Sequence, residues 1–289
     1  MTSAPPALTA ENTSRFLRTK RFRIHYHEAG TGHPIVLLHG SGPGATAWSN
    51  FRPNIEALSA GFRVLALDMP GWGESDTQTA ETGRDHVATL IEFLDETGVD
   101  RAALVGNSMG GMTSITTAIQ HPDRVSHLVT MGAPSPGPNL FSAGNGPSEG
   151  LKALVQAYKE PTPENMRRLV AIMCFDPAMA TEELAALRSK SATAHPEHLR
   201  SFLEGMTVPP DRSPMAAFFG LGAQLGSITA PTMAIHGRDD RVVHFENSLR
   251  LTTAVPDSRL VLLNRCGHWA QIEHAAEFNR LVAAFVDAH

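Results

Sequence analysis

The stretch Ala102-Ala103-Leu104-Val105-Gly106-Asn107-Ser108-Met109-Gly110 decides the fold. Its first four residues form a short apolar β-run, and helical spacing begins at Met109. Between them stands a serine with a glycine two residues away on either side, the pattern of a tight strand-to-helix turn. Such a turn lifts the hydroxyl above a sheet edge, near a helix N-terminus that favours negative charge. Ser108 is therefore a candidate nucleophile. An ordinary glycine-rich turn is the alternative, which the flanking strand and helix disfavour.

Short apolar runs of the same kind recur along the chain and predict strands that are buried on both faces. They cover residues 35–38, 64–67, 102–105, 127–131, 232–235 and 260–263, and residues 22–28 alternate as a half-exposed strand does. Helical patterns lie between them at residues 85–97, 109–120 and 273–288. Strand and helix alternate repeatedly, which predicts an α/β fold with a mostly parallel, doubly wound sheet.

One region breaks this alternation. Residues 135–225 contain no convincing β-run, but residues 151–159 and 164–173 have helical spacing, and breaks at Pro161, Pro163, Pro177, Pro196 and Pro209-Pro210 divide the region. We predict a core of residues 1–134 and 226–289 with an inserted helical lid at 135–225. A plain helical extension of the core is the alternative.

Composition narrows the class of protein. The chain has 289 residues, of which 42 % are hydrophobic and 18 % charged. Its net charge of -5 does not indicate the basic surface that nucleic-acid binding requires. Cys174 and Cys266 are too few and too far apart for a disulfide framework or a structural zinc site. No signal peptide and no run of about 18 apolar residues occurs. We expect a cytoplasmic protein with a small-molecule substrate, no cofactor, no metal, and no nucleic-acid or membrane partner.

A serine hydroxyl needs a base to remove its proton, and His268 is the best candidate. Gly267-His268-Trp269 follows the apolar run 260–263 and precedes the last helix, so His268 is expected at the carboxyl edge of the sheet. His39 also follows a strand, but its glycine-rich surroundings favour a structural role. His236 ends a strand and is interpreted as a packing residue.

The base in turn needs a carboxylate that fixes its tautomer. Gly237-Arg238-Asp239-Asp240 follows the run 232–235, and the resulting chain order Ser, Asp, His is the one used by hydrolases with this type of serine turn. Two aspartates compete for the role. We predict Asp240, three residues after the glycine, and assign Asp239 to a loop hydrogen bond or ion pair.

The loop His39-Gly40-Ser41-Gly42-Pro43-Gly44 can supply an oxyanion hole. It follows the run 35–38 and can present a backbone N–H opposite that of Met109. Phosphate binding is the rival role for a glycine-rich loop. However, the segment lacks the Gly-Lys-Ser/Thr ending of a P-loop and the dinucleotide-binding spacing, so a nucleotide site is disfavoured.

The chain resembles the meta-cleavage product hydrolases, which have the α/β-hydrolase fold and cleave carbon–carbon bonds in ring-fission products of aromatic catabolism. The strand-to-helix turn at Ser108 occurs in many hydrolases, but further segments make the resemblance specific. They are Thr13-Ser14-Arg15-Phe16-Leu17, His39-Gly40-Ser41-Gly42-Pro43-Gly44-Ala45 with Trp48-Ser49-Asn50, Asp68-Met69-Pro70-Gly71-Trp72-Gly73-Glu74-Ser75-Asp76, Thr181-Glu182-Glu183-Leu184 with Arg188, and Cys266-Gly267-His268-Trp269-Ala270-Gln271. Many family members have glycine where this chain has Ser41, a change that a backbone donor tolerates.

The resemblance implies a catalytic triad of Ser108, Asp240 and His268 and an oxyanion hole formed by the N–H groups of Ser41 and Met109. It also implies substrate contacts by polar or small residues, which are Gly42, Asn50, Asn107, Arg188 and Trp269. An arginine in an apolar lid can grip a carboxylate, and an indole N–H can donate from an apolar wall. The alternatives are a surface position for the arginine and simple packing for the tryptophan.

The implied reaction is hydrolysis of a 2-hydroxy-6-oxo-hexa-2,4-dienoate to 2-hydroxypenta-2,4-dienoate and a carboxylic acid. We expect ketonisation of the dienol, then attack at the 6-carbonyl and an acyl-enzyme on Ser108. Relatives form dimers or higher assemblies, so a homo-oligomer is also implied. The alternatives are a carboxylesterase or lactonase with the same triad, and a non-catalytic small-molecule binder of this fold. A haloalkane dehalogenase is excluded because the turn carries serine rather than aspartate.

Overall fold

The sheet organises the chain. A computed structural model describes residues 7–79, 82–137, 141, 147–207 and 214–288. Within these residues the strands form one eight-stranded sheet in the order β1-β2-β4-β3-β5-β6-β7-β8. Neighbouring strands from β4 to β8 pair in parallel, while β2 pairs antiparallel with both β1 and β4. The predicted α/β class and mostly parallel sheet are confirmed.

The elements have the following bounds. The strands are β1 Ser14–Arg18, β2 Arg23–Ala29, β3 Pro34–Leu38, β4 Arg63–Leu67, β5 Ala102–Asn107, β6 Val125–Met131, β7 Thr232–Gly237 and β8 Ser258–Leu263. The α-helices are α1 Ala10–Thr13, α2 Ala47–Leu58, α3 His86–Glu96, α4 Met109–Gln120, α5 Glu149–Lys159, α6 Pro163–Met173, α7 Glu182–Thr193, α8 Pro196–Thr207, α9 Pro214–Phe219, α10 Glu246–Ala254, α11 Ala270–Glu273 and α12 Ala275–Asp287. Short 3-10 segments are η1 Pro122–Arg124, η2 Pro177–Met179 and η4 Gly220–Ser227.

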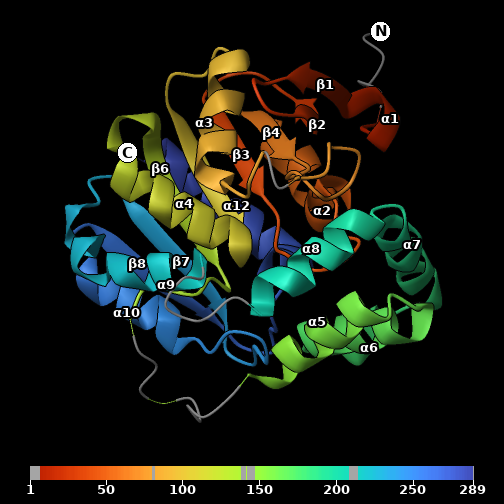
Figure 1. Cartoon of the computed structure of the whole chain (residues 1–289). Helices are drawn as coiled ribbons and strands as arrows, with labels where there is room; N and C mark the ends of the chain where they lie inside the picture. The colour runs from red at the N-terminus through yellow and green to blue at the C-terminus, as the bar shows by residue number, and fades with distance from the viewer. Residues whose placement is uncertain (1–6, 80–81, 138–140, 142–146, 208–213, 289) are drawn as a thin grey trace, which may run out of the picture.

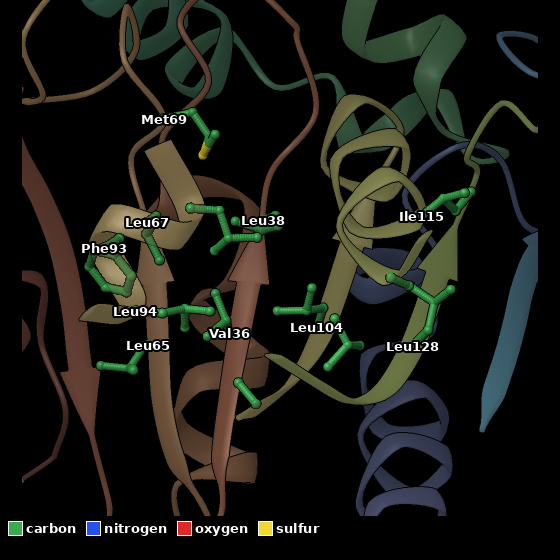
Figure 2. Packing of buried hydrophobic residues seen from close by; sticks show 14 of the residues in the cluster. Val36, Leu38, Leu65, Leu67, Met69, Phe93, Leu94, Leu104, Ile115 and Leu128 are labelled. Carbon is green, nitrogen blue, oxygen red and sulfur yellow. The ribbon is translucent and has the colours of Figure 1, made fainter. Parts of the chain in front are cut away.

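Both faces of the sheet are covered, because alternate residues of each central strand point to opposite sides. On one face, Val36, Leu65, Leu104 and Leu128 from four adjacent strands pack under α3 and α4 (Figure 2). On the other face, the alternate strand residues pack against α2 and α12. The runs at residues 35–38, 64–67, 102–105, 127–131 and 232–235 are therefore strands buried on both sides, as predicted. The run at 260–263 is a strand too, but it lies at the sheet edge and is only partly buried, which corrects the prediction for this run.

The segment between β6 and β7 carries α5 to α8, which lie together beyond one end of the sheet (Figure 1). We call these four the lid helices. The first three share an apolar cluster of their own, which Val242 and Trp269 from loops at the sheet edge complete. By contrast, Phe218 of α9 and Leu225 of η4 pack into the main core. The predicted break at Pro209-Pro210 lies outside the described residues, as does the start of the N-terminal segment.

The carboxyl ends of the parallel strands meet at the edge that faces the lid helices. β3, β5, β7 and β8 each lead there into a loop or turn singled out by the sequence. This is the edge at which open α/β sheets bind their ligands. Among the described residues, no helix is both long and apolar enough to cross a membrane.

Replacing Leu104 by alanine tests the central position of β5. Leu104 is fully buried, so we expect Leu104→Ala to lower the free energy of unfolding by about 2–5 kcal/mol, through lost burial and a residual cavity. Leu249→Ala on helix α10, where the side chain is 40 % exposed, should change it by less than about 1 kcal/mol. Urea denaturation measures both. Equal shifts would contradict this account of the core.

Candidate active site

Ser108 occupies the turn between β5 and α4 in a strained conformation. Its φ is 52° and its ψ is -111°, a left-handed value that L residues other than glycine rarely adopt. A Cβ at Gly106 would lie 2.3 Å from the Gly110 carbonyl oxygen, and one at Gly110 would lie 2.1 Å from that of Leu38. Only glycine fits at either position. The tight strand-to-helix turn predicted from the sequence is therefore present, with the serine at its apex.

His268 and Asp240 form a buried hydrogen-bonded pair. The imidazole Nδ1 lies 2.7 Å from Asp240 Oδ2, and both side chains are almost wholly buried. Asp240 Oδ1 accepts hydrogen bonds from the backbone N–H groups of Val242 (2.7 Å) and Val243 (3.0 Å). Burial raises the pKa of Asp240, but attraction to His268 and the hydrogen bonds outweigh it and hold the pKa well below its usual value. The carboxylate is therefore charged at neutral pH.

The second aspartate has a different partner. Asp239 is part-exposed and pairs with the Arg238 guanidinium at 3.4 Å, while its backbone N–H donates to the Cys266 carbonyl. Of the two candidates, the structure places Asp240 against the imidazole and Asp239 in a loop ion pair.

The turn at Ser108 and the loop that carries His268 are both hydrogen bonded near the end of strand β6. The Ser108 N–H donates to the Met131 carbonyl at 3.0 Å, and Asn107 Nδ2 donates to the carbonyls of Met131 and His268, both at 3.1 Å. A Cβ at Gly132 would lie 2.8 Å from His268 Nδ1, so the imidazole lies directly over this residue. Among the described residues, the Ser108 hydroxyl and the imidazole are not hydrogen bonded to each other. Such contacts often tighten only when a substrate binds.

The loop after β3 lies against the serine. A Cβ at Gly40 would come within 3.3 Å of Ser108 Cβ. Within the described part of the chain, the backbone N–H groups of Ser41 and Met109 have no hydrogen-bond acceptor. Met109 is also the first residue of α4, where the helix dipole favours negative charge. Two unengaged donors beside a serine are suited to hold a developing oxyanion.

A cavity of about 80 Å³ lies between the lid helices and the loops of the sheet edge. Its lining comprises Ser49, Asn50, Val170, Cys174, Met179, Leu184, Arg188, Trp269 and Ile272. Most of these side chains are apolar. The arginine is the one cationic group among the lining residues, so the cavity is suited to a largely apolar molecule that carries an anionic group.

Arg188 is buried without an acidic partner. Its side chain is 3 % exposed, its Nη2 donates to the Pro43 carbonyl at 3.0 Å, and its guanidinium lies 5.3 Å from the centre of the Trp269 ring. In the residues that the structure describes, no carboxylate lies within ion-pair distance, and Nε has no hydrogen-bond partner. Burial lowers the pKa of Arg188 to about 10, so the group is still charged at neutral pH. An uncompensated buried charge of this kind is suited to an incoming anion.

Comparisons with known proteins agree with this geometry. Residues 33–275 match the model of the alpha/beta hydrolase fold family. The chain is 42 % identical to a 2-hydroxy-6-oxononadienedioate/2-hydroxy-6-oxononatrienedioate hydrolase of Cupriavidus pinatubonensis, with 97 % of each chain covered. It is 40 % identical to a 2-hydroxy-6-oxo-6-phenylhexa-2,4-dienoate hydrolase of Comamonas testosteroni, over 96 % of this chain and 98 % of that one. An acetate complex of the meta-cleavage product hydrolase of Pseudomonas fluorescens superposes with a TM-score of 0.83 at 34 % identity, covering 95 % of this chain and 97 % of that one.

The chain belongs to the meta-cleavage product hydrolase family. The predicted family and the α/β-hydrolase fold are confirmed, and the protein is an enzyme of the class that hydrolyses carbon–carbon bonds.

The residues predicted to contact substrate in this hydrolase divide into two groups. Asn50, Arg188 and Trp269 line the same cavity, and Gly42 borders it, since a Cβ there would lie 2.7 Å from Arg188 Nη2. Asn107 does not line the cavity. It is fully buried and its amide nitrogen is engaged by two backbone carbonyls, so in this structure it holds the His268 loop in place.

His236 has a role that the sequence did not reveal. Its Nε2 lies 3.2 Å from Asp240 Oδ2 and 2.9 Å from the Val243 carbonyl, and its Nδ1 lies 2.7 Å from Ser248 Oγ. The interpretation as a packing residue was therefore wrong. The tautomer with hydrogen on Nε2 satisfies all three contacts, because that nitrogen donates and Nδ1 accepts from the hydroxyl. The available signal was the i, i+4 spacing of histidine and aspartate across a strand end.

His39, in contrast, is structural as predicted. Its Nδ1 donates to the Gly40 carbonyl at 2.8 Å, and its Nε2 accepts from the Met69 N–H at 3.0 Å. Both ring nitrogens are thus used by backbone groups.

Replacing His236 by asparagine or glutamine separates its two contacts. Asparagine can reach only the Ser248 side, so His236→Asn removes a donor to the Asp240 carboxylate, a bond worth about 1.5–3 kcal/mol. We therefore expect His236→Asn to lower the free energy of unfolding at pH 7 by about 1.5–3 kcal/mol and to lower kcat about tenfold or more. His236→Gln carries an amide to the Nε2 position and should retain most of both quantities.

The pH dependence identifies the carboxylate as the group involved. Because the pKa of Asp240 is lowered by folding, its stabilisation is present above its unfolded pKa of about 3.9 and is lost as pH falls toward the folded value. The two proteins share the unfolded-state pKa, so the difference in unfolding free energy between His236→Asn and the unsubstituted protein depends on the folded-state pKa of Asp240, which loss of the donor raises. Measured by urea denaturation, this difference should be constant near neutral pH and shrink as pH falls through the folded-state pKa of Asp240 in the variant. A difference that stays constant throughout the acid range in which both proteins remain folded would assign His236 to packing alone.

Proposed function

We propose that this hydrolase cleaves the carbon–carbon bond between C5 and C6 of a 2-hydroxy-6-oxo-hexa-2,4-dienoate. The products are 2-hydroxypenta-2,4-dienoate and a carboxylic acid. The single observation that carries the proposal is Arg188, a buried guanidinium with no acidic partner among the described residues, in a cavity that is also lined by Trp269, the neighbour of His268 in the chain. An esterase has no need of a buried cation, whereas the dienoate carries the anion that would neutralise it.

Ser108, Asp240 and His268 act as the catalytic triad in this proposal. Ketonisation of the dienol first makes C5 able to accept an electron pair. His268 then takes the Ser108 proton as Oγ attacks the C6 carbonyl, and the N–H groups of Ser41 and Met109 hold the oxyanion. Collapse of this intermediate breaks the C5–C6 bond, and the electron pair passes from C5 through the C3–C4 double bond to the oxygen on C2. The proton held by His268 neutralises the resulting dienolate at that oxygen, which gives 2-hydroxypenta-2,4-dienoate. Water activated by His268 releases the acid from the acyl-enzyme.

The cavity residues orient the substrate. Arg188 binds the carboxylate, and Asn50, Gly42 and Trp269 surround the dienol end, which places C6 toward Ser108. The resemblance to family members also assigns a contact to Asn107. Its hydrogen bonds in this structure support an indirect contribution instead, through the His268 loop. The lid helices, which belong to the predicted insertion at residues 135–225, cover this cavity, whereas α9 and η4 pack into the main core.

We propose a cytoplasmic homo-oligomer as the working form. Two reduced, buried cysteines are consistent with a reducing compartment. Strand β8 ends the sheet and exposes 41 % of Leu262, an edge that a second copy can cover. Light scattering after size-exclusion chromatography gives the mass directly, and a mass of one chain would contradict the proposal.

Removing the Ser108 hydroxyl tests the nucleophile. Ser108→Ala should bind the yellow dienoate but fail to cleave it, with single-turnover cleavage at least about 10³-fold slower, because no acyl-enzyme can form. Loss of the dienoate absorbance measures this. Ser227→Ala on exposed η4 is a control that should cleave normally. Unchanged single-turnover cleavage by Ser108→Ala would remove Ser108 from the mechanism.

Replacing Arg188 by methionine tests the carboxylate site. We expect kcat/KM for the dienoate to fall about 100-fold or more, since truncating one partner of a buried charge pair costs about 2–5 kcal/mol. Hydrolysis of p-nitrophenyl acetate, which has no carboxylate, should fall much less, and Arg188→Lys should be intermediate. Equal losses on both substrates would mean that Arg188 does not recognise the carboxylate.

The same assay selects the group beyond the scissile bond. The two named relatives differ there, one substrate ending in a second carboxylate and the other in a phenyl ring. Measuring both substrates with the unsubstituted protein compares their kcat/KM directly. Hydrolysis of the ester without hydrolysis of either dienoate would favour a carboxylesterase.

A further inference from the structure

Three consecutive carbonyls of the loop after β3 each accept a hydrogen bond from a different side chain. Tyr158 Oη donates to the Ser41 carbonyl at 2.6 Å, Trp72 Nε1 to that of Gly42 at 3.1 Å, and Arg188 Nη2 to that of Pro43 at 3.0 Å. All three donors are almost fully buried.

The donors come from parts of the chain far from the loop. Tyr158 lies on lid helix α5 and Arg188 on lid helix α7, while Trp72 belongs to the segment after β4. The approach to α7 is close, since a Cβ at Gly44 would lie 2.0 Å from the Arg188 carbonyl oxygen. The loop is therefore held largely by the lid helices.

Within the loop, one backbone hydrogen bond closes a turn, from the Ala45 N–H to the Gly42 carbonyl at 3.1 Å, but Gly40, Gly42 and Gly44 alternate through the loop and leave it little stiffness of its own. Glycine has the largest backbone freedom of any residue. An oxyanion hole, however, is effective only when its donors point in the required direction before the reaction. The side-chain hydrogen bonds on the three carbonyls supply the restraint that the loop sequence lacks.

The hydroxyl of Tyr158 is itself oriented by its neighbours. Its oxygen lies 3.3 Å from His198 Nε2, and its ring stacks on Phe202 with 3.9 Å between ring centres. Burial and nearby cationic groups lower the pKa of His198 to about 3, so this ring is neutral at working pH and can donate from Nε2. Burial raises the pKa of Tyr158, which keeps the phenol protonated. The phenol hydrogen is therefore directed at the Ser41 carbonyl.

We propose that Tyr158 and Trp72 are positioning residues of the oxyanion hole, and that through Tyr158 the lid helices set the direction of the Ser41 N–H. The Ser41 N–H shares a rigid peptide plane with the Gly40 carbonyl, which accepts from His39 Nδ1 at 2.8 Å, and Tyr158 anchors the next peptide plane through the Ser41 carbonyl. With both planes beside the Ser41 Cα held, rotation about its backbone bonds is restricted and the N–H keeps its direction. The inference rests on the proposed function only in that Ser108 must attack a carbonyl or an equivalent electrophile. It does not depend on which bond is cleaved.

Tyr158→Phe removes the hydroxyl and keeps the ring. We expect kcat to fall about 10- to 100-fold with KM changed less than about twofold, because the loss appears only when the oxyanion forms. Phosphonylation of Ser108 by a fluorophosphonate should slow by a similar factor. Tyr26→Phe is the matched control, since Tyr26 is the chain's one other tyrosine and lies on β2 against Phe93. Its variant should match the unsubstituted protein.

Trp72→Phe gives a second probe if Tyr158→Phe does not fold. It removes the N–H on the Gly42 carbonyl, and kcat and phosphonylation should again fall with KM nearly constant. Unchanged kcat and phosphonylation in the folded variants would overturn the proposal, as would a rise in KM alone or a lower melting temperature without a kinetic effect. If the protein cleaves p-nitrophenyl acetate but no dienoate, the proposed carbon–carbon activity fails, and the ester kcat still decides the role of Tyr158.

Discussion

The left-handed backbone of Ser108 is the constraint on which the site depends. A non-glycine residue in such a region costs about 1–3 kcal/mol, which its surroundings must supply. Here β5 and α4 continue the turn on either side, the Ser108 N–H is bonded to β6, and glycines at positions 106 and 110 allow the backbones to approach closely. The strained conformation of Ser108 thereby sets the positions of its hydroxyl, of the first N–H of α4 and of the end of β6, over which His268 lies.

Burying charge imposes a second constraint, and the site meets it in two different ways. Asp240 is compensated from within the protein, by two backbone N–H groups and two imidazoles. Within the part of the chain that the structure describes, Arg188 is compensated only by a carbonyl and by the face of Trp269. The difference matches the proposed chemistry, because the aspartate keeps its charge through every turnover, whereas the arginine must be able to exchange one anion for another.

Local patterns in the sequence were enough for the sheet and for the centre of the site. The strand-to-helix turn at Ser108 needed only the glycine spacing and the flanking periodicity. Each apolar run is a short local signal and became a strand, although the one at 260–263 is a partly exposed edge strand, and the exposed edge strand β1 was not predicted. Helix α2 was not predicted, since Pro53 lies inside it and interrupts the pattern. The roles of His236 and Asn107 also could not be read from sequence. Both depend on which carbonyl or carboxylate a folded loop brings within 3–4 Å, and spacing along the chain does not determine that.

Contacts from distant residues also explain why the loop after β3 seems, from its sequence alone, to be able to form the oxyanion hole without help. Its glycines indicate that the backbone can adopt an unusual path, but they also remove the stiffness that would keep it there. The restraint comes from Tyr158, Trp72 and Arg188, which lie 30 to 145 positions away along the chain, so no pattern within the loop points to them. Two of them belong to the lid helices, so rigidity at the reacting carbonyl is a property of the junction between lid and sheet. A lid that recognises the substrate and also holds the oxyanion loop connects binding to reactivity through shared hydrogen bonds.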